Sequence, residues 1–400
     1  MATKLVSTSG AITAILDGSY STIRRVGNRA VFLGDSNTFG YNQSGENYPD
    51  ATCLYSKGQI VKVKNAGVSG QTTAQIAARV QADVIALNPN ICFVMAGTND
   101  ITDSVNLLAV ENTYKTGILD PLLAAGITPI ICSVLPNNYS TARAGAVIRL
   151  NSWLRRQAAT LGVPYVDFHG AFVDPATGGW LTTYHSAEVG DTLHANAVGY
   201  RVMGKIAADT VANFLPRIYA PIVNDNIDVN NLWDNGCFLT DATADSKPDG
   251  FGIGVGTAAA GLSYALEAAT GYKGNSWKLT LANPDGDLSR GLTRTITASG
   301  RFAVGDRLAL AAMVDIDSNT LPAGGGYKLE IVWTGGSGGT QTLIRTGVQI
   351  TNGVAYAEVT VPTGATAVEV RHYCIGAAAE THVWRLGQFT AYNLTTQNAV

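Results

Sequence analysis

The stretch VFLGDSNTFG, residues 31–40, decides the fold class of this sequence. Its apolar run enters Gly34-Asp35-Ser36 and stops, which is typical of a buried strand that turns directly into a helix. Serine is a preferred cap at the start of a helix, so Ser36 has two interpretations, a cap or a nucleophile. Groups elsewhere in the chain have to decide between them.

Four more apolar runs follow, and they alternate with longer segments that carry apolar residues at three-and-four spacing. Strands that are apolar on both faces and separated by crossover helices predict a parallel sheet covered on both sides. We therefore expect a three-layer α/β domain over residues 29–218. Its strands are predicted at 29–34, 60–67, 90–97, 127–135 and 163–168, and its helices at 72–87, 104–126, 142–162 and 196–216.

After Pro216 the sequence becomes Gly-rich, and apolar and polar residues alternate. Short strands with Gly, Asn and Asp between them predict an antiparallel sandwich of jelly-roll type over residues 219–400. The stretch GGSGG, 335–339, fits a GxSxG nucleophile motif, but no helix follows it, so we expect a turn. Residues 1–28 fit neither domain and are expected to form an N-terminal extension. The sandwich strands are predicted at 306–316, 327–335, 354–362, 366–376 and 382–394.

The charge balance disfavours two classes of partner. The 400-residue chain has a formal net charge of −3, with 14% charged residues and its Lys and Arg scattered. It has no basic stripe for nucleic acid and no polybasic anchor for a membrane. No apolar run approaches the roughly 20 residues of a membrane span, and the N-terminus lacks the continuous apolar segment of a signal peptide. We expect no nucleic-acid partner and no membrane partner.

The cysteines indicate neither a disulfide framework nor a metal site. They are odd in number, widely spaced and without a CxxC pair, so they are predicted to be small core residues. The sequence has no HExxH motif, and its Asp191/His194 pair lacks a third and a fourth ligand. We therefore expect no metal. The cysteines are Cys53, Cys92, Cys132, Cys237 and Cys374.

The loops after the first three predicted strands carry polar or small residues. In an open parallel sheet, functional groups gather beyond the carboxyl ends of the strands, so these loops should face one crevice. They carry Ser36, Gly70 and Asn99. The N–H groups of Ser36 and Gly70 and the carboxamide of Asn99 are three donors that could converge on a developing oxyanion.

A nucleophilic serine needs a base, and the base needs a group that orients it. The segment GDTLHANAVGY, 190–200, supplies Asp191 and His194 just before the last predicted helix. Three residues apart in a turn, the carboxylate can hold the Nδ1 proton while Nε2 faces the serine. Each residue of the set also has an ordinary explanation as a cap, a turn residue or a helix-start acid. Together and in this order, they favour acyl transfer.

At these residues the chain resembles the SGNH hydrolases, also called GDSL esterases. The resemblance covers residues 29–217 and implies a flavodoxin-like fold and hydrolysis through an acyl-enzyme without a cofactor. It also implies a triad of Ser36, His194 and Asp191 and an oxyanion hole of Ser36, Gly70 and Asn99. The four matching blocks are GDSNT with Ser36, NAGVSG with Gly70, GTND with Asn99, and DTLH with Asp191 and His194.

Three further residues are candidates for substrate binding. Asn37 stands where the name-giving motif of the family has Leu, at a position that varies within the family. Trp180 and His185 precede the Asp191/His194 pair, and loops in such positions often line a site.

The second domain indicates the substrate class. NLWDNGCF, 231–238, and KPDGFG, 247–252, look like the start of carbohydrate-binding jelly-roll modules. An esterase joined to such a module implies removal of O-acetyl groups from a polysaccharide. Large aromatic residues of this domain either stack on sugar rings or form the sandwich core, and the core is their more frequent role. They are Trp233, Trp277, Trp333, Trp384 and Tyr373.

Two alternatives stay open. One is a small-ester lipase or thioesterase of the same family. The other is a glycan-binding tail or structural protein with a vestigial esterase domain, although the intact set of five residues argues against it. The pairing of domains also resembles bacteriophage tail-associated esterases, which implies a homotrimer and a virion-associated or extracellular place of action. A cytoplasmic esterase, or a secreted bacterial esterase whose signal was removed, is a further interpretation.

Overall fold

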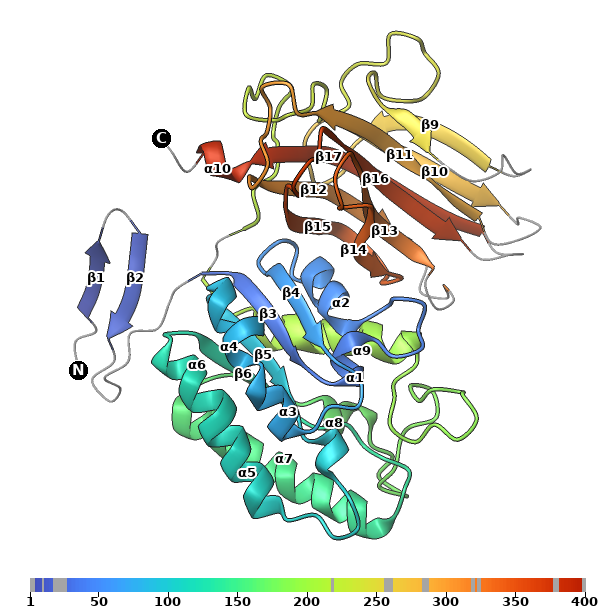
Figure 1. Cartoon of the computed structure of the whole chain (residues 1–400). Helices are drawn as coiled ribbons and strands as arrows, with labels where there is room; N and C mark the ends of the chain where they lie inside the picture. Colours follow the sequence, from blue (N-terminus) through green and yellow to red (C-terminus); the bar gives the residue numbers. More distant parts are fainter. Residues whose placement is uncertain are drawn as a thin grey trace. The chain divides into compact units, whose positions relative to one another are not determined.

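The computed structural model of the chain contains two compact units (Figure 1). One consists of residues 1–52 and 59–219, and the other of residues 53–58 and 220–400. Within the segment predicted as an N-terminal extension, β1 (Lys4–Thr8) and β2 (Ala11–Leu16) pair antiparallel in a two-stranded sheet. The residues that the structure describes are 4–8, 11–16, 27–216, 219–254, 262–282, 288–317, 321, 325–376 and 381–397.

The first unit is built on a five-stranded parallel sheet with the order β4-β3-β5-β6-β7. Numbered along the chain, this is the 2-1-3-4-5 order of flavodoxin-like sheets, which reverses between β3 and β5. Ligands bind at such a reversal, beyond the carboxyl ends of the strands, so the loops after β3 and β5 flank the expected crevice. The strands are β3 (Arg29–Gly34), β4 (Val61–Gly67), β5 (Ile91–Met95), β6 (Thr128–Cys132) and β7 (Tyr165–Val166).

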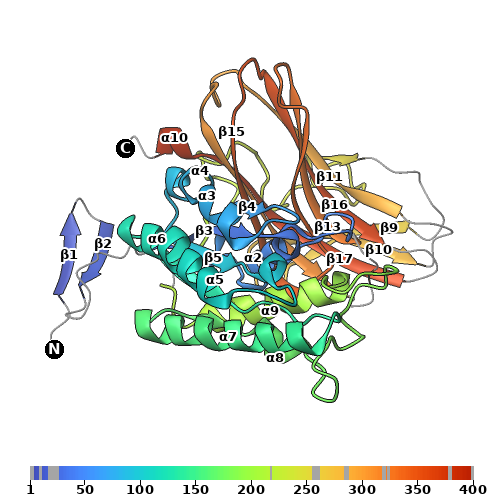
Figure 2. The ribbon, with the colours of Figure 1, turned by 60° about the horizontal axis from the view of Figure 1, so that its bottom comes forward.

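Helices cover both faces of this sheet, which explains why its strands are continuous apolar runs. Val31 and Leu33 of β3 lie in a buried cluster shared with α3, α5 and α7, and Figure 2 shows α7 beside α5. Phe32, between them, faces the other way and packs edge-on against Tyr48 of α2, with ring centroids 5.6 Å apart. The helices are α1 (Ser36–Phe39), α2 (Tyr48–Tyr55), α3 (Thr73–Ala78), α4 (Val80–Asp83), α5 (Leu107–Tyr114), α6 (Asp120–Ala124), α7 (Thr141–Leu161), α8 (Phe168–Phe172) and α9 (Ala197–Val211).

Two of the predicted helices are interrupted. The segment 72–87 was predicted to be one helix, but it breaks at Arg79, whose φ of −110° and ψ of 4° end α3. The Arg79 guanidinium donates to the Gly34 carbonyl at the end of β3, at 2.7 Å. This is a tertiary contact, so the break cannot be predicted from the spacing of apolar residues. In the segment 104–126, a π-helical turn, Lys115–Leu119, joins α5 to α6.

The second unit is a sandwich of two five-stranded antiparallel sheets, with the orders β15-β12-β17-β10-β9 and β14-β13-β16-β11-β8. The predicted fold class, an α/β domain with a parallel sheet followed by an all-β sandwich, is confirmed. The GGSGG stretch forms the turn between β13 and β14, as predicted. The elements are β8 (Gly252–Gly254), β9 (Leu262–Ala268), β10 (Asn275–Ala282), β11 (Leu288–Thr297), β12 (Arg307–Ile316), β13 (Gly326–Thr334), β14 (Thr340–Thr346), β15 (Ile350–Thr360), β16 (Ala367–Gly376), β17 (Thr381–Asn393) and α10 (Leu394–Gln397).

The aromatic residues considered for sugar stacking lie in the sandwich interior. Their exposed fractions are 6% or less, and Trp233 also lines a cavity of this domain. The core interpretation is therefore confirmed for Trp233, Trp277, Trp333, Trp384 and Tyr373. All five cysteines of the chain are buried as well, as predicted.

A buried carboxyl group starts the first helix. Asp35 is fully buried and caps α1, and its Oδ1 accepts a hydrogen bond from the Asn37 N–H at 2.9 Å. Burial raises the pKa of Asp35 to about 6, although the Asn37 N–H favours the ionised form. The folded state therefore disfavours the carboxylate above about pH 6, and this effect vanishes below the ordinary pKa of 3.8.

A buried ion pair holds helix α9 to the segment after α1. Arg201 of α9 donates from Nε and Nη2 to the two carboxylate oxygens of Glu46, both at 2.8 Å. Both side chains are almost completely buried. Since the paired geometry is bidentate, it offsets the loss of hydration that each charge suffers.

We expect the Asp35→Asn variant to become more stable relative to the wild type as the pH rises. The amide still caps the helix but carries no charge. Because the pKa of Asp35 is raised from 3.8 to about 6, the difference in unfolding free energy should move in favour of the variant by roughly 2–3 kcal/mol between pH 3.5 and pH 7.5. Urea titrations followed by circular dichroism at 222 nm measure it. A difference that stays constant with pH contradicts the burial effect.

The Glu46→Gln variant should lose about 3–5 kcal/mol of unfolding free energy, because it leaves the Arg201 charge buried without its counter-ion. The same urea titration measures this loss. Asp209→Asn is the matched control on the same helix, since Asp209 pairs with Lys205 in an exposed i,i+4 bridge and should change stability by less than about 0.5 kcal/mol. Equal losses in the two variants would contradict the importance of the buried pair.

Candidate active site

The nucleophile candidate lies where β3 turns into α1. Ser36 is the first residue of α1, so its N–H has no acceptor within the helix and can serve a ligand. Ser36 as a whole is only 4% exposed. The close approach of α1 to β4 requires a glycine, because a Cβ on Gly67 would lie 2.2 Å from the Phe39 nitrogen.

Ser36, His194 and Asp191 form a continuous hydrogen-bonded chain. The Ser36 Oγ lies 2.8 Å from His194 Nε2. On the other side of the imidazole, Nδ1 lies 3.0 and 3.1 Å from the two carboxylate oxygens of Asp191. With the Nδ1 proton on the side of the carboxylate, Nε2 is free to accept the serine proton.

The electrostatics keep the Asp191 carboxylate ionised. Burial raises the pKa of Asp191, but hydrogen bonds from the N–H groups of Leu193 and His194, together with the nearby imidazole, lower it overall. The negative charge can therefore stabilise the imidazolium that forms when His194 takes a proton. Nearby, burial lowers the pKa of His185, so this second imidazole stays neutral beside the pair.

The loops after β4 and β5 meet beside the serine turn. Gly70 adopts a left-handed backbone with φ of 79°, which favours glycine, and no atom lies within 4 Å of where its Cβ would be. Asn99 donates from Nδ2 to the Gln71 carbonyl at 2.9 Å, which joins the two loops directly. The second proton of this amide is available to a ligand.

The loop that carries Asp191 and His194 is held by main-chain hydrogen bonds. The Ser186 N–H donates to the His194 carbonyl at 2.9 Å, and the Asn138 N–H donates to the Thr192 carbonyl at 3.0 Å. Two separate segments of backbone therefore position this loop. Sequence motifs do not reveal such contacts, because any residue type can make them.

The three residues predicted to bind substrate have other environments. Asn37 is fully buried, and its Nδ2 donates to the Leu193 carbonyl at 3.4 Å, so it supports the loop before His194. Trp180 is 3% exposed and packs against His185, with ring centroids 5.4 Å apart. None of the three lines the cavity beside the candidate triad. A contact of Asn37, Trp180 or His185 with substrate stays a prediction.

A cavity of about 230 Å³ adjoins the triad, and two aromatic residues in its wall were not predicted from the sequence. Tyr41 stacks on the His194 imidazole, with ring centroids 4.2 Å apart and planes 27° from parallel. Tyr139 is half-exposed and comes from the segment before α7. Neither belongs to a motif, so only their proximity to the triad identifies them. The lining consists of Tyr41, Tyr139, Glu188, Val189, Gly190, Asp191, Thr192, Leu193 and His194.

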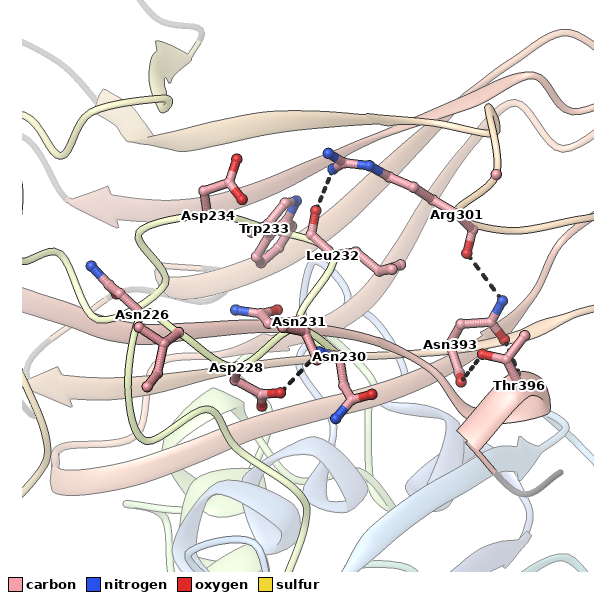
Figure 3. A pocket seen from close by; sticks show the side chains of 13 residues that line it. Asn226, Asp228, Asn230, Asn231, Leu232, Trp233, Asp234, Arg301, Asn393 and Thr396 are labelled. Carbon is pink, nitrogen blue, oxygen red and sulfur yellow. Dashed lines mark hydrogen bonds between the residues drawn. The ribbon is translucent and has the colours of Figure 1, made fainter. Parts of the chain in front are cut away.

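A second cavity, of about 630 Å³, lies in the sandwich domain (Figure 3). Several polar side chains that line it already form hydrogen bonds within the protein. Asp228 accepts hydrogen bonds from the Asn230 N–H at 2.9 Å and from the Tyr392 hydroxyl at 2.7 Å. Arg301 donates to the Leu232 carbonyl. The lining contains no histidine, so it offers no serine–histidine pair.

Neither a membrane span nor a cluster of metal ligands is found among the described residues. None of their helices combines the length and apolar character that crossing a bilayer demands. Within the same part of the chain, no three side chains of His, Cys, Asp or Glu gather as ligands for a metal ion.

Known proteins resemble the α/β domain in sequence. Residues 32–202 match the model of the GDSL-like lipase/acylhydrolase family. The uncharacterised lipoprotein YqeF of Bacillus subtilis strain 168 is 40% identical over 117 residues, which make up 26% of this chain and 48% of that protein. The chain thus matches about half the length of this relative.

Solved structures include two similar enzymes. The lipase/acylhydrolase from Enterococcus faecalis is 21% identical, with 48% of this chain and 100% of that chain covered and a TM-score of 0.39. A catalytic mutant of an acetylxylan esterase from Geobacillus stearothermophilus is 19% identical, with 49% and 98% covered and a TM-score of 0.38. The family match over residues 32–202 contains all five residues of the candidate triad and oxyanion hole, and it supports the assignment of the α/β domain to the GDSL (SGNH) family of lipases and acylhydrolases.

Proposed function

We propose that the protein is a serine esterase that removes O-acetyl groups from a polysaccharide. The observation that carries the proposal is the hydrogen-bonded chain from Ser36 Oγ through His194 to Asp191, at 2.8 Å and 3.0 Å. It lies at the reversal of strand order in the sheet, where ligands of such folds bind. The GDSL family match supports ester hydrolysis as the reaction class.

In the proposed mechanism, His194 takes the Ser36 proton as Oγ attacks the ester carbonyl. The resulting oxyanion accepts hydrogen bonds from the N–H groups of Ser36 and Gly70 and from the Asn99 amide. His194 then gives its proton to the leaving sugar oxygen, and an acetyl-enzyme remains. Water, deprotonated by His194, attacks this ester, and acetate leaves as Ser36 regains its proton. Asp191 stabilises the imidazolium in both steps.

The acetyl group and the glycan are the finer part of the proposal. The joining of the esterase domain to an antiparallel sandwich supports both, because this pairing resembles that of esterases that act on polysaccharides. A small-ester lipase or thioesterase is the alternative within the family. Esters of increasing acyl length separate the two, because an acetylesterase loses activity steeply beyond acetate and a lipase does not.

The place of action and the assembly belong to the same proposal. We infer an extracellular or virion-associated enzyme, as expected for tail-associated esterases, which would act on bacterial surface glycans as a homotrimer. The name of one relative, a lipoprotein, is in line with an extracellular setting. The antiparallel sandwich, whose strands β10 to β17 are divided between two sheets, is compatible with the jelly-roll type expected of a glycan-binding module.

Ser36→Ala should abolish acetate release from O-acetylated polysaccharides, with turnover falling on the order of 10⁴-fold or more, because no nucleophile remains. Ser152→Ala, which changes an exposed serine of α7, is the matched control and should retain full activity. Acetate is quantified by an enzyme-coupled assay. If the wild type cleaves nitrophenyl acetate but no glycan, the proposed substrate is wrong. If it cleaves neither, the protein is a binding protein.

Asn99→Ala should lower kcat by about 10²–10³ with a smaller effect on KM, because the Asn99 amide stabilises the oxyanion mainly in the transition state. Steady-state kinetics with nitrophenyl acetate measure both constants. Asn106→Ala, at the exposed cap of α5, is the control and should leave kcat unchanged. A KM effect without a kcat effect would contradict an oxyanion role for Asn99.

A further inference from the structure

We infer that Tyr139 forms a stacking subsite for the pyranose ring that carries the ester. The inference rests on the proposed deacetylase function and deepens it by assigning the sugar-binding side of the site. Tyr139 lines the cavity that also contains His194 and Asp191, and it is 49% exposed. A large exposed aromatic ring beside a reaction centre is a surface that a ligand can cover.

The Tyr139 ring is preorganised on one of its faces. The guanidinium carbon of Arg143 lies 4.4 Å from the ring centroid, so Arg143 covers that face. Arg143 is held in turn by Asp103, with Nη2 and Oδ2 3.1 Å apart. Arg143 therefore restrains the Tyr139 side chain and leaves the rest of its ring exposed. Because the ring is already restrained, Tyr139 loses little side-chain entropy when a ligand stacks on it.

The backbone on both sides of Tyr139 is fixed as well. The Asn138 N–H donates to the Thr192 carbonyl at 3.0 Å, which links the segment directly to the loop of Asp191 and His194. Ser140, the next residue, caps α7 by accepting from the Arg143 N–H at 3.2 Å. Tyr139 therefore keeps a constant position relative to the imidazole that protonates the leaving sugar.

The chemistry of the cavity favours a sugar over a fatty chain. The lining combines apolar surface from Tyr41, Tyr139 and Val189 with polar groups of Glu188 and Thr192. Glu188 is exposed, and its carboxylate accepts a hydrogen bond from Asn42 Nδ2. A pyranose ring has the matching character, with an apolar C–H face and hydroxyl groups around its edge, whereas a fatty chain offers no hydroxyl groups to the polar side chains.

The inference gives the chain an exposed aromatic surface outside the sandwich. The large aromatic residues of the sandwich are 6% exposed or less, whereas Tyr139 is 49% exposed. Tyr139 supplies such a surface next to the triad, so the sugar would be bound close to the residues that cleave its ester.

The test compares two substrates, glucose pentaacetate and ethyl acetate, and uses the ratio of their kcat/KM values. Tyr139→Ala should lower this ratio about tenfold, mainly through KM for the sugar, because ethyl acetate has no ring to stack. Tyr139→Phe keeps the ring and should restore the ratio to within about twofold of the wild type. The matched control is Phe214→Ala, an exposed aromatic residue beyond the far end of α9, and it should leave the ratio unchanged.

Two results would overturn the subsite. One is an unchanged ratio in Tyr139→Ala. The other is a selective loss of activity on ethyl octanoate, which would assign Tyr139 to an acyl chain. Failure of the proposed function is seen separately and earlier, in the wild type: cleavage of ethyl acetate without cleavage of glucose pentaacetate rejects the deacetylase and the subsite that rests on it.

Discussion

The candidate active site of the α/β domain depends on one hydrogen bond, between the Ser36 hydroxyl and the His194 imidazole, which joins residues 158 positions apart at 2.8 Å. One end of this bond is fixed by a buried strand that turns into a helix within two residues. The other end lies in a loop without regular structure, so contacts from other segments of the chain must hold that loop in place. The ion pair of Glu46 with Arg201 and the main-chain bonds to the 184–196 segment provide this support. Packing, capping and loop geometry thus all help to keep Ser36 Oγ within hydrogen-bond distance of His194 Nε2.

Two buried carboxyl groups near this bond, Asp35 and Asp191, show how the environment shifts a pKa. Complete burial raises the pKa of Asp35 to about 6, and the hydrogen bonds that the carboxyl receives do not outweigh this effect. Burial acts in the same direction on Asp191, but two backbone N–H groups and an imidazole outweigh it. The first group is placed at a helix start, where it positions the backbone of the serine. The second is placed behind a base, where its charge is needed. Their different pKa values follow from their neighbours and not from residue type.

The sequence alone predicts the parallel sheet and brings Ser36, Gly70, Asn99, Asp191 and His194 to one edge, because continuous apolar strands and their order define where the loops end. It does not predict the break at Arg79, because a tertiary contact decides it. It also misses five strands of the sandwich, β8, β9, β10, β11 and β14, and among these β11 and β14 are polar in composition. Tyr41 and Tyr139 were missed for a related reason: an isolated aromatic residue in a loop has no period and no motif. Conversely, Trp180 and His185 lie in the right segment, but the fold turns them toward each other.

The bond between Asn138 and Thr192 is made by main-chain atoms alone, so it does not depend on which side chain occupies position 139. Natural variation at this position can therefore alter which ligand is held without displacing the reacting groups. Side chains of different size or polarity at position 139 would change the surface beside the triad, while Asp191 and His194 keep their places. The backbone bond thus separates the position of the triad from the character of the surface next to it.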